Sequence, residues 1–152
     1  YQKLSDQKKK TTIRCQASET LLTDTKFMLQ YKEYFDVTLI CPPYFDMEIY
    51  HEGPQSTDLY PNYDEWLQSY WHNTVKVMKH ITKKGGLLAV IANDYQTLDG
   101  DSYPLTTDLH KITSKYFTLI EMFYLQNRTS PLRVNAKDRT ERLFLYVVED
   151  SP

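Results

Sequence analysis

The residues best suited to chemistry stand together in the tetrapeptide Cys41-Pro42-Pro43-Tyr44. Proline cannot donate to a sheet ladder, and it pushes the preceding residue into extended geometry, so this turn is rigid and nearly free of backbone donors. The turn follows an apolar run at 37–40, which predicts a strand buried on both faces. A rigid turn with an aromatic ring at the carboxyl end of such a strand lies where open α/β sheets bind ligands.

The turn and its continuation, Phe45-Asp46-Met47-Glu48-Ile49-Tyr50, resemble the catalytic motif of amino-group DNA methyltransferases. That family methylates adenine N6 or cytosine N4 with S-adenosylmethionine. Its motif is Asp, Asn or Ser, then Pro-Pro and an aromatic residue, and one subgroup continues with a Phe-Asp-Leu-Glu type of extension. The resemblance implies a Rossmann-like α/β fold, with a mostly parallel sheet and an antiparallel edge hairpin. It also implies S-adenosylmethionine as the cofactor, and no metal.

The resemblance further implies a role for each residue of the turn. An exocyclic amine is a poor nucleophile, so the base must leave the stack, rest on an aromatic ring and donate hydrogen bonds from its amine. Tyr44 is then the stacking surface, and the Pro42 carbonyl and the side chain at position 41 are the acceptors in a turn that Pro43 completes. Cys41 departs from the family, because a thiol is a weak acceptor. Removing one preorganised polar partner typically costs ~3–4 kcal/mol of transition-state stabilisation.

The sequence does not contain the glycine-rich cofactor loop of a complete methyltransferase. None of its four glycines lies in a Gly-x-Gly arrangement after a strand. We expect a short strand at 11–15, and by the resemblance Ser18 and Glu19 after it reach the adenine of the cofactor. The alternative is a helix start with Ser18 as its N-cap. The chain therefore resembles the latter part of the fold, without the N-terminal cofactor-binding strands.

Periodicity predicts an alternation of helices and strands around the turn. The spacing of Phe27, Met28, Tyr31 and Tyr34 indicates a helix before the first strand. After the turn we expect a functional loop at 51–63 and a long helix from Asp64-Glu65 to Ile81, whose end is capped by Lys83-Lys84-Gly85-Gly86. An apolar strand at 87–92 should follow this helix. The last elements expected are a helix at 105–115 capped by Thr107 or Asp108, and a hairpin of 116–125 with 143–148.

The partners expected from this reading are DNA and another protein chain that completes the fold. The loop at 126–142 is the most basic stretch, and its Arg128 and Arg133 are candidate contacts to the DNA backbone, together with Phe45 beside the turn. The formal net charge of −2 requires any DNA contact to be local or shared with another chain.

Length and composition predict a polar lead-in at 1–10 and one methyltransferase-like domain at 11–150. Cys15 and Cys41, the only cysteines, show no metal-ligand spacing. No apolar run reaches transmembrane length and no signal peptide is visible, so we expect an intracellular protein, in the cytoplasm, nucleoid or nucleus.

Three functions are compatible with these features. The first is methyl transfer to an amino group of a DNA base, by this chain together with a missing N-terminal half or a partner chain. The second is a degenerate, non-catalytic methyltransferase-like subunit with a structural or DNA-associated role, which Cys41 and the absent loop suggest. The third is a Pro-Pro-Tyr peptide ligand for a WW-type domain, which requires the turn to be exposed.

Overall fold

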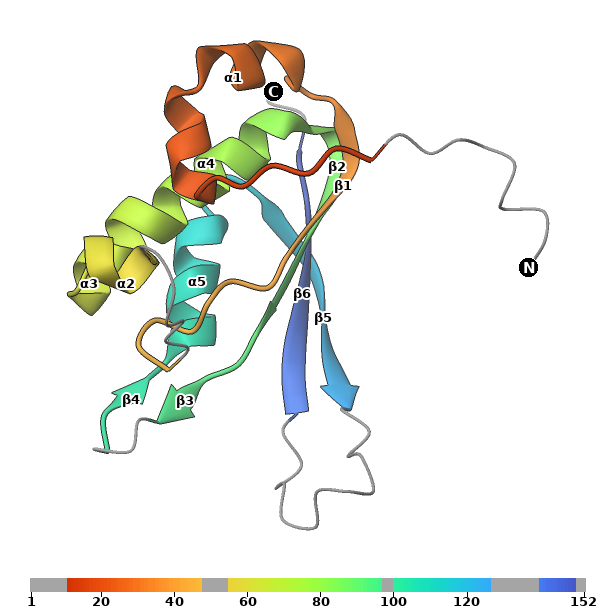
Figure 1. Ribbon diagram of the computed structural model, residues 1–152. Helices are drawn as coiled ribbons and strands as arrows, with labels where there is room; N and C mark the ends of the chain where they lie inside the picture. The colour runs from red at the N-terminus through yellow and green to blue at the C-terminus, as the bar shows by residue number, and fades with distance from the viewer. Residues whose placement is uncertain (1–10, 48–54, 97–99, 127–139, 150–152) are drawn as a thin grey trace.

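A mixed sheet forms one layer of the molecule, and helices pack on one of its faces. The computed structural model describes residues 11–47, 55–96, 100–126 and 140–149. The four-stranded sheet has the order β1-β2-β6-β5, and Figure 1 shows α4 and α5 on the same side of it. Among the described residues, no helix has both the length and the apolar character needed to cross a membrane.

The sheet combines one parallel pair of strands with an antiparallel hairpin. β1 (Phe35–Ile40) runs parallel to β2 (Thr82–Ala92). β6 (Thr140–Val147) is antiparallel to β2 and also to β5 (Thr118–Gln126), which takes the edge. The predicted α/β fold with its antiparallel hairpin is confirmed. A second, two-stranded sheet of β3 (Tyr95–Gln96) and β4 (Ser102–Tyr103) was not predicted.

The long helix expected after the turn is present, with a change of winding in its middle. It runs through α3 (Tyr63–Trp66), the π-helix η3 (Leu67–Trp71) and α4 (His72–Ile81). The Asn62 side chain caps it by accepting hydrogen bonds from the backbone N–H groups of Asp64 and Glu65. The other helices are η2 (Ser18–Thr23), α1 (Thr25–Gln30), α2 (Ser56–Leu59) and α5 (Leu105–Thr113).

The core lies between the helices and one face of the sheet. Residues directly opposite in neighbouring strands share a face, and Leu88 with Tyr146 and Val90 with Phe144 are such pairs, all buried. Trp66 and Trp71 are fully buried in the same core, as the helical spacing predicts. The core thus depends on one face of the sheet only.

The opposite face of the sheet is apolar and partly open. The middle of this face is formed by residues that lie side by side on three strands: Leu39 of β1, Ala89 of β2 and Leu145 of β6. Val37 and Leu39 are 57% and 65% exposed, so the prediction that β1 is buried on both faces is wrong for the described part of the chain. The physical reason is that α4 and α5 pack on the other face of the sheet (Figure 1), so among the described residues no helix covers Val37 and Leu39.

Two local predictions also fail. The segment at 11–15 is exposed and forms no strand, because no described strand lies beside it. The glycines at 85–86 do not cap the helix, since α4 ends at Ile81 and β2 begins at Thr82. Phe35 lies opposite Thr82 and Val37 opposite Leu87, so residues 83–86 bulge from the ladder. Gly85 takes its positive φ of 69° in this bulge.

Gly86→Ala is expected to destabilise the fold. An added Cβ would lie 2.8 Å from the Lys83 carbonyl oxygen and 3.0 Å from that of Asp36, and backbone atoms cannot move aside cheaply. Overpacking of this kind costs about 1–3 kcal/mol. Urea denaturation measures the loss. Gly85→Asn is the matched control, because asparagine tolerates positive φ and nothing lies within 4 Å of the new Cβ. An equal loss from both variants would contradict the steric explanation.

Candidate active site

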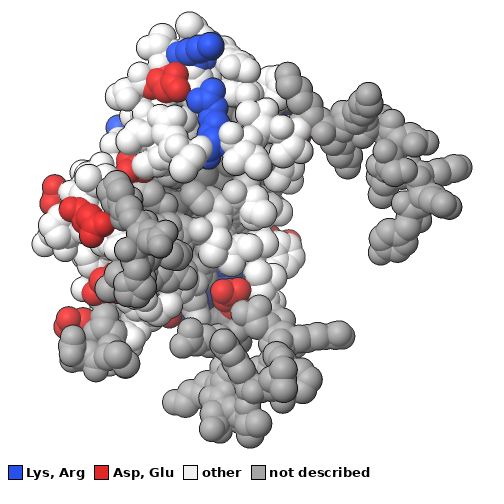
Figure 2. Space-filling model, viewed as in Figure 1, with Lys and Arg blue, Asp and Glu red and all other residues white. Residues whose placement is uncertain are grey.

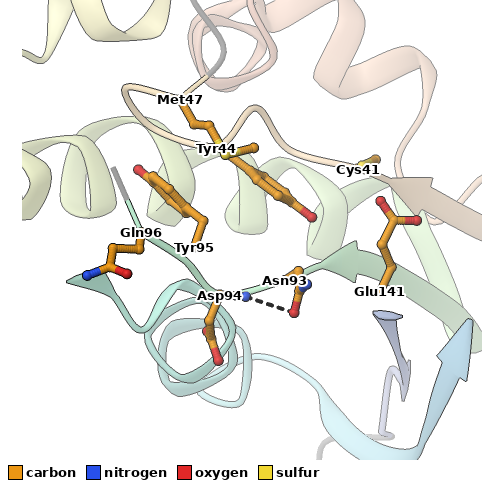
Figure 3. A pocket seen from close by; sticks show the side chains of 8 residues that line it. All are labelled: Cys41, Tyr44, Met47, Asn93, Asp94, Tyr95, Gln96 and Glu141. Carbon is orange, nitrogen blue, oxygen red and sulfur yellow. Dashed lines mark hydrogen bonds between the residues drawn. The ribbon is translucent and has the colours of Figure 1, made fainter. Parts of the chain in front are cut away.

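The carboxyl ends of β1 and β2 open into a pocket of about 320 Å³, at the lower end of the range for small-molecule sites. The Pro-Pro turn leaves β1 on one side of it, and the segment after β2 forms the other side (Figure 3). The lining residues are Cys41, Tyr44, Met47, Asn93, Asp94, Tyr95, Gln96 and Glu141. Two residues of the predicted catalytic motif, Cys41 and Tyr44, therefore face a pocket at the expected edge of the sheet.

The turn is folded into the molecule. Tyr44 is 8% exposed, Pro42 is fully buried, and the Met47 backbone N–H donates to the Tyr44 carbonyl oxygen at 2.8 Å. Cys41 is exposed. Because a WW-type ligand must present its tyrosine to a partner, the burial of Tyr44 argues against the peptide-ligand hypothesis.

Tyr95 packs against the aromatic ring of the turn. The Tyr44 and Tyr95 rings stack with their centroids 5.8 Å apart and an interplanar angle of 18°. The Tyr95 hydroxyl donates to Asp46 Oδ1 at 2.8 Å, which ties the ring to the chain just beyond the turn. Burial raises the pKa of Tyr95, and the hydrogen bond to Asp46 raises it further, so the phenol stays a donor. A base that stacks on Tyr44 must use the other face of the ring or displace Tyr95.

Phe45, one of the three residues proposed for DNA contact, does not lie on the surface of this pocket. Phe45 is 5% exposed and lies in the aromatic core, edge-on to Trp66 at a centroid distance of 5.9 Å. It also contacts the rings of Tyr63 and Tyr103, so a contact between Phe45 and DNA requires the turn to open. Arg128 and Arg133 lie outside the described residues.

Asp94 joins three elements at the floor of the site. Its Oδ1 accepts hydrogen bonds from the backbone N–H and hydroxyl of Thr106, at 2.8 and 2.7 Å. Its Oδ2 pairs with Arg142 at 3.0 Å, and the same Arg142 nitrogen donates to the Thr106 hydroxyl. Asp94 therefore supplies the hydrogen-bond acceptor for the first turn of α5. From the sequence, Thr107 or Asp108 was expected to cap this helix. The same carboxylate anchors the start of β6.

Ser18 and Glu19 lie on η2, away from the residues that line the pocket. The Ser18 hydroxyl is hydrogen bonded to that of Thr74 on α4 at 2.8 Å, and it begins the helix instead of capping it. Glu19 is buried, and its Oε2 has no hydrogen-bond partner among the described residues. Burial raises the pKa of Tyr60, and the Glu19 carboxylate raises it further. A cofactor contact of either residue stays a prediction.

Several pocket residues were missed at the sequence level. Asn93, Asp94 and Tyr95 directly follow the apolar run at 87–92, and the rule that ligands bind at the carboxyl ends of neighbouring parallel strands could have found them. Glu141 gave no comparable signal. It precedes the run at 143–148, and only the register of β6 against β2 brings it to the pocket.

The face shown in Figure 2 has no extended patch of positive charge among the described residues. In the view of Figure 2, Lys and Arg side chains show mainly near the upper end, acidic side chains show mainly along the helical side, and a further acidic group shows lower down over the strands. Within the pocket, Asp94 is paired with Arg142 while Glu141 adds a second carboxylate. Among the described residues, no cluster of three or more His, Cys, Asp or Glu side chains could hold a metal ion.

Comparison with known proteins places the fold among methyltransferases. TTHA0409 from Thermus thermophilus, provisionally named a DNA modification methylase, superposes with a TM-score of 0.63 at 13% sequence identity, over 90% of this chain and 53% of that one. Its complex with S-adenosyl-L-methionine gives 0.61 at 15% identity, over 90% of this chain and 54% of that one. The N-methyltransferase NodS from Bradyrhizobium japonicum is a weaker match, with a TM-score of 0.45.

The likeness to TTHA0409 shows a Rossmann-like methyltransferase fold, and the chain spans about half the length of the TTHA0409 chains that it matches. No protein-family model matches the sequence, and no curated protein is significantly similar to it.

The described residues that line the pocket can accommodate a flat group that carries a donor amine. The pocket has an aromatic ring and carboxylates, which suit a base with a donor amine. A Rossmann-type cofactor site also needs a glycine-rich turn after a strand, and none of the four glycines in the sequence lies in a Gly-x-Gly arrangement.

Asp94→Ala should lower the free energy of unfolding by about 2–3 kcal/mol, because it leaves Arg142 and the first turn of α5 without their acceptor. Thermal or urea unfolding gives the value. Glu121→Ala on the exposed edge strand is the control, expected to change stability by no more than about 0.5 kcal/mol. If Asp94→Ala lowers the free energy of unfolding no more than Glu121→Ala does, Asp94 does not hold these elements together.

Proposed function

We propose that this protein takes part in S-adenosylmethionine-dependent methyl transfer to an exocyclic amino group of a DNA base, adenine N6 or cytosine N4. The observation that carries the proposal is the Cys41-Pro42-Pro43-Tyr44 turn, with Cys41 and Tyr44 lining a pocket at the carboxyl ends of two parallel strands. The methyltransferase fold of the neighbours supports it, and the provisional name of TTHA0409 favours DNA as the substrate.

In this proposal the chain holds the base and prepares its amine. Tyr44 offers a ring face for stacking, and base–aromatic stacking contributes about 1–3 kcal/mol per base. The Pro42 carbonyl accepts one hydrogen bond from the amine, since proline leaves no competing N–H in the turn. When it is bound, S-adenosylmethionine supplies an electrophilic methyl group. Ser18 and Glu19 are candidate contacts to its adenine, and Arg128 and Arg133 are candidate contacts to phosphate.

The open face of the sheet supports the view that a second half completes the enzyme. Sheets with parallel strands in α/β proteins are normally covered on both faces, whereas Val37 and Leu39 lie largely exposed beside an edge of β1 that no described strand pairs with. The matched region accounts for about half of TTHA0409. We assign this face to the cofactor-binding half of the fold, in the same polypeptide or in a partner chain.

Calorimetric titration with S-adenosylmethionine and transfer of labelled methyl groups into DNA test the proposed function. We expect no cofactor binding by the 152 residues alone. We expect binding and transfer once the chain is produced with the flanking coding sequence of its own gene, or with the partner that carries the remaining strands. A completed fold that binds the cofactor and methylates no DNA indicates the degenerate, non-catalytic subunit instead.

Leu39→Lys separates assembly from folding. Because Leu39 is 65% exposed, the substitution should change the stability of the isolated chain by no more than about 0.5 kcal/mol. In the assembled protein it places a charge in an apolar interface, and cofactor binding should be lost. Lys84→Leu, at an exposed position in the bulge of β2, is the control and should leave cofactor binding intact. Full binding by Leu39→Lys would show that the second half packs elsewhere.

A further inference from the structure

The side chain at position 41 does not supply the strong hydrogen-bond acceptor that the proposed methyl transfer needs beside the Pro42 carbonyl. An amine that attacks a methyl group must lose a proton, and a polar acceptor near residue 41 stabilises the developing positive charge. The Cys41 thiol is a weak acceptor, so a further group in the same pocket is needed.

Most of the other acceptors in the pocket are already engaged. Both carboxylate oxygens of Asp94 accept hydrogen bonds, from Thr106 and Arg142. Asn93 Oδ1 accepts from the Asp94 backbone N–H at 3.0 Å. Gln96 points away from Cys41 toward the far end of the pocket, where its Nε2 donates to the Gly100 carbonyl oxygen at 3.1 Å (Figure 3).

Glu141 is the exception among the lining carboxylates. It makes no hydrogen bond or ion pair with any residue that the structure describes. Figure 3 shows its carboxyl group directed toward the side of the pocket where Cys41 lies.

The register of the sheet explains how Glu141 reaches this position. Arg142 lies opposite Ala92 and points to the helical face, where it meets Asp94. Successive residues of a strand alternate between faces, so Glu141 points to the opposite face. Cys41 directly follows Ile40, which lies opposite Val90 on the other side of β2. Cys41 and Glu141 therefore flank the end of the central strand and both enter the pocket.

We propose that the Glu141 carboxylate is the acceptor for the exocyclic amine of a nucleobase held on Tyr44, in place of the acceptor that Cys41 does not provide. This inference deepens the proposed function and rests on it for its catalytic consequence. As the amine nitrogen bonds to the methyl carbon, the carbon–sulfur bond of the donor breaks with its electron pair on sulfur. The proton of the methylated nitrogen passes to a Glu141 oxygen and from there to water.

The first test needs neither cofactor nor activity. Cys41 and Cys15 are both exposed, so the alkylation of Cys41 by iodoacetamide can be followed by mass spectrometry with Cys15 as the internal reference. Glu141→Gln removes a negative charge beside the thiol and should speed the alkylation of Cys41 by about three- to tenfold. Glu121→Gln on the edge strand is the matched control. No change at Cys41 would overturn the proposed proximity.

Nucleosides then test the amine contact. In the wild-type chain, 2′-deoxyadenosine or 2′-deoxycytidine should protect Cys41 from alkylation better than 2′-deoxyinosine or 2′-deoxyuridine, which carry a carbonyl in place of the amine. Glu141→Ala should abolish this preference. Equal protection by both members of each pair in the wild type would overturn the inference, whatever the chain catalyses.

A double-mutant cycle in the completed enzyme tests the catalytic consequence. Glu141→Ala should lower kcat by about 10²–10³-fold when residue 41 is cysteine. It should lower kcat less than about tenfold in a Cys41→Asn background, where the new amide supplies an acceptor. Equal decreases of kcat in both backgrounds would indicate a structural role for Glu141. They would overturn the proposal that Glu141 acts in place of the missing acceptor at position 41. If nucleosides with an amine are preferred but no methyl transfer occurs, the proposed function fails while the amine contact stands.

Discussion

The carboxylate of Asp94 is the interaction on which the arrangement of the site depends. It lies two residues after the end of β2, accepts hydrogen bonds from Thr106 in the first turn of α5, and pairs with Arg142 on β6. Asn93 and Tyr95 flank it in the chain, and Glu141 precedes Arg142, so one ion pair sets the positions of residues from two strands. Most of the residues that line the pocket opposite the turn are therefore neighbours in sequence of Asp94 or Arg142. The turn itself is held separately, by the packing of Phe45 into the aromatic core.

The sequence was most informative where the pattern was long or chemically extreme. The helical spacing of Trp66, Tyr70 and Trp71 required a buried face, and two adjacent prolines required the chain to leave the sheet. Both requirements are set by residues close together in the sequence, so the sequence alone predicts them. The apolar run at 37–40 was misread because β-branched residues indicate a strand and not which of its faces is covered.

The remaining features depend on tertiary register, which a single sequence does not encode locally. Asp94 accepts from the first turn of α5 because β2 ends beside that helix, although Thr107 and Asp108 have suitable side chains. Gly85 has the positive φ that glycine favours, but the insertion of residues 83–86 into β2 puts it in a bulge. Glu141 enters the pocket only through the pairing of β6 with β2. In the first two cases the tertiary structure overrides a sound local expectation, and in the third it brings in a residue for which there was no sequence signal.

The position of the two tryptophans has a practical consequence for following the molecule in solution. Trp66 contacts Phe45 of the turn, whereas Trp71 donates its indole N–H to the Leu109 carbonyl oxygen within the helical layer. Both rings are fully buried, so their fluorescence is set by the protein and not by water. A movement of the turn removes an aromatic neighbour from one tryptophan and leaves the other unchanged. The emission of Trp66 is thus a built-in optical signal for opening of the turn, separable from global unfolding, which exposes both rings.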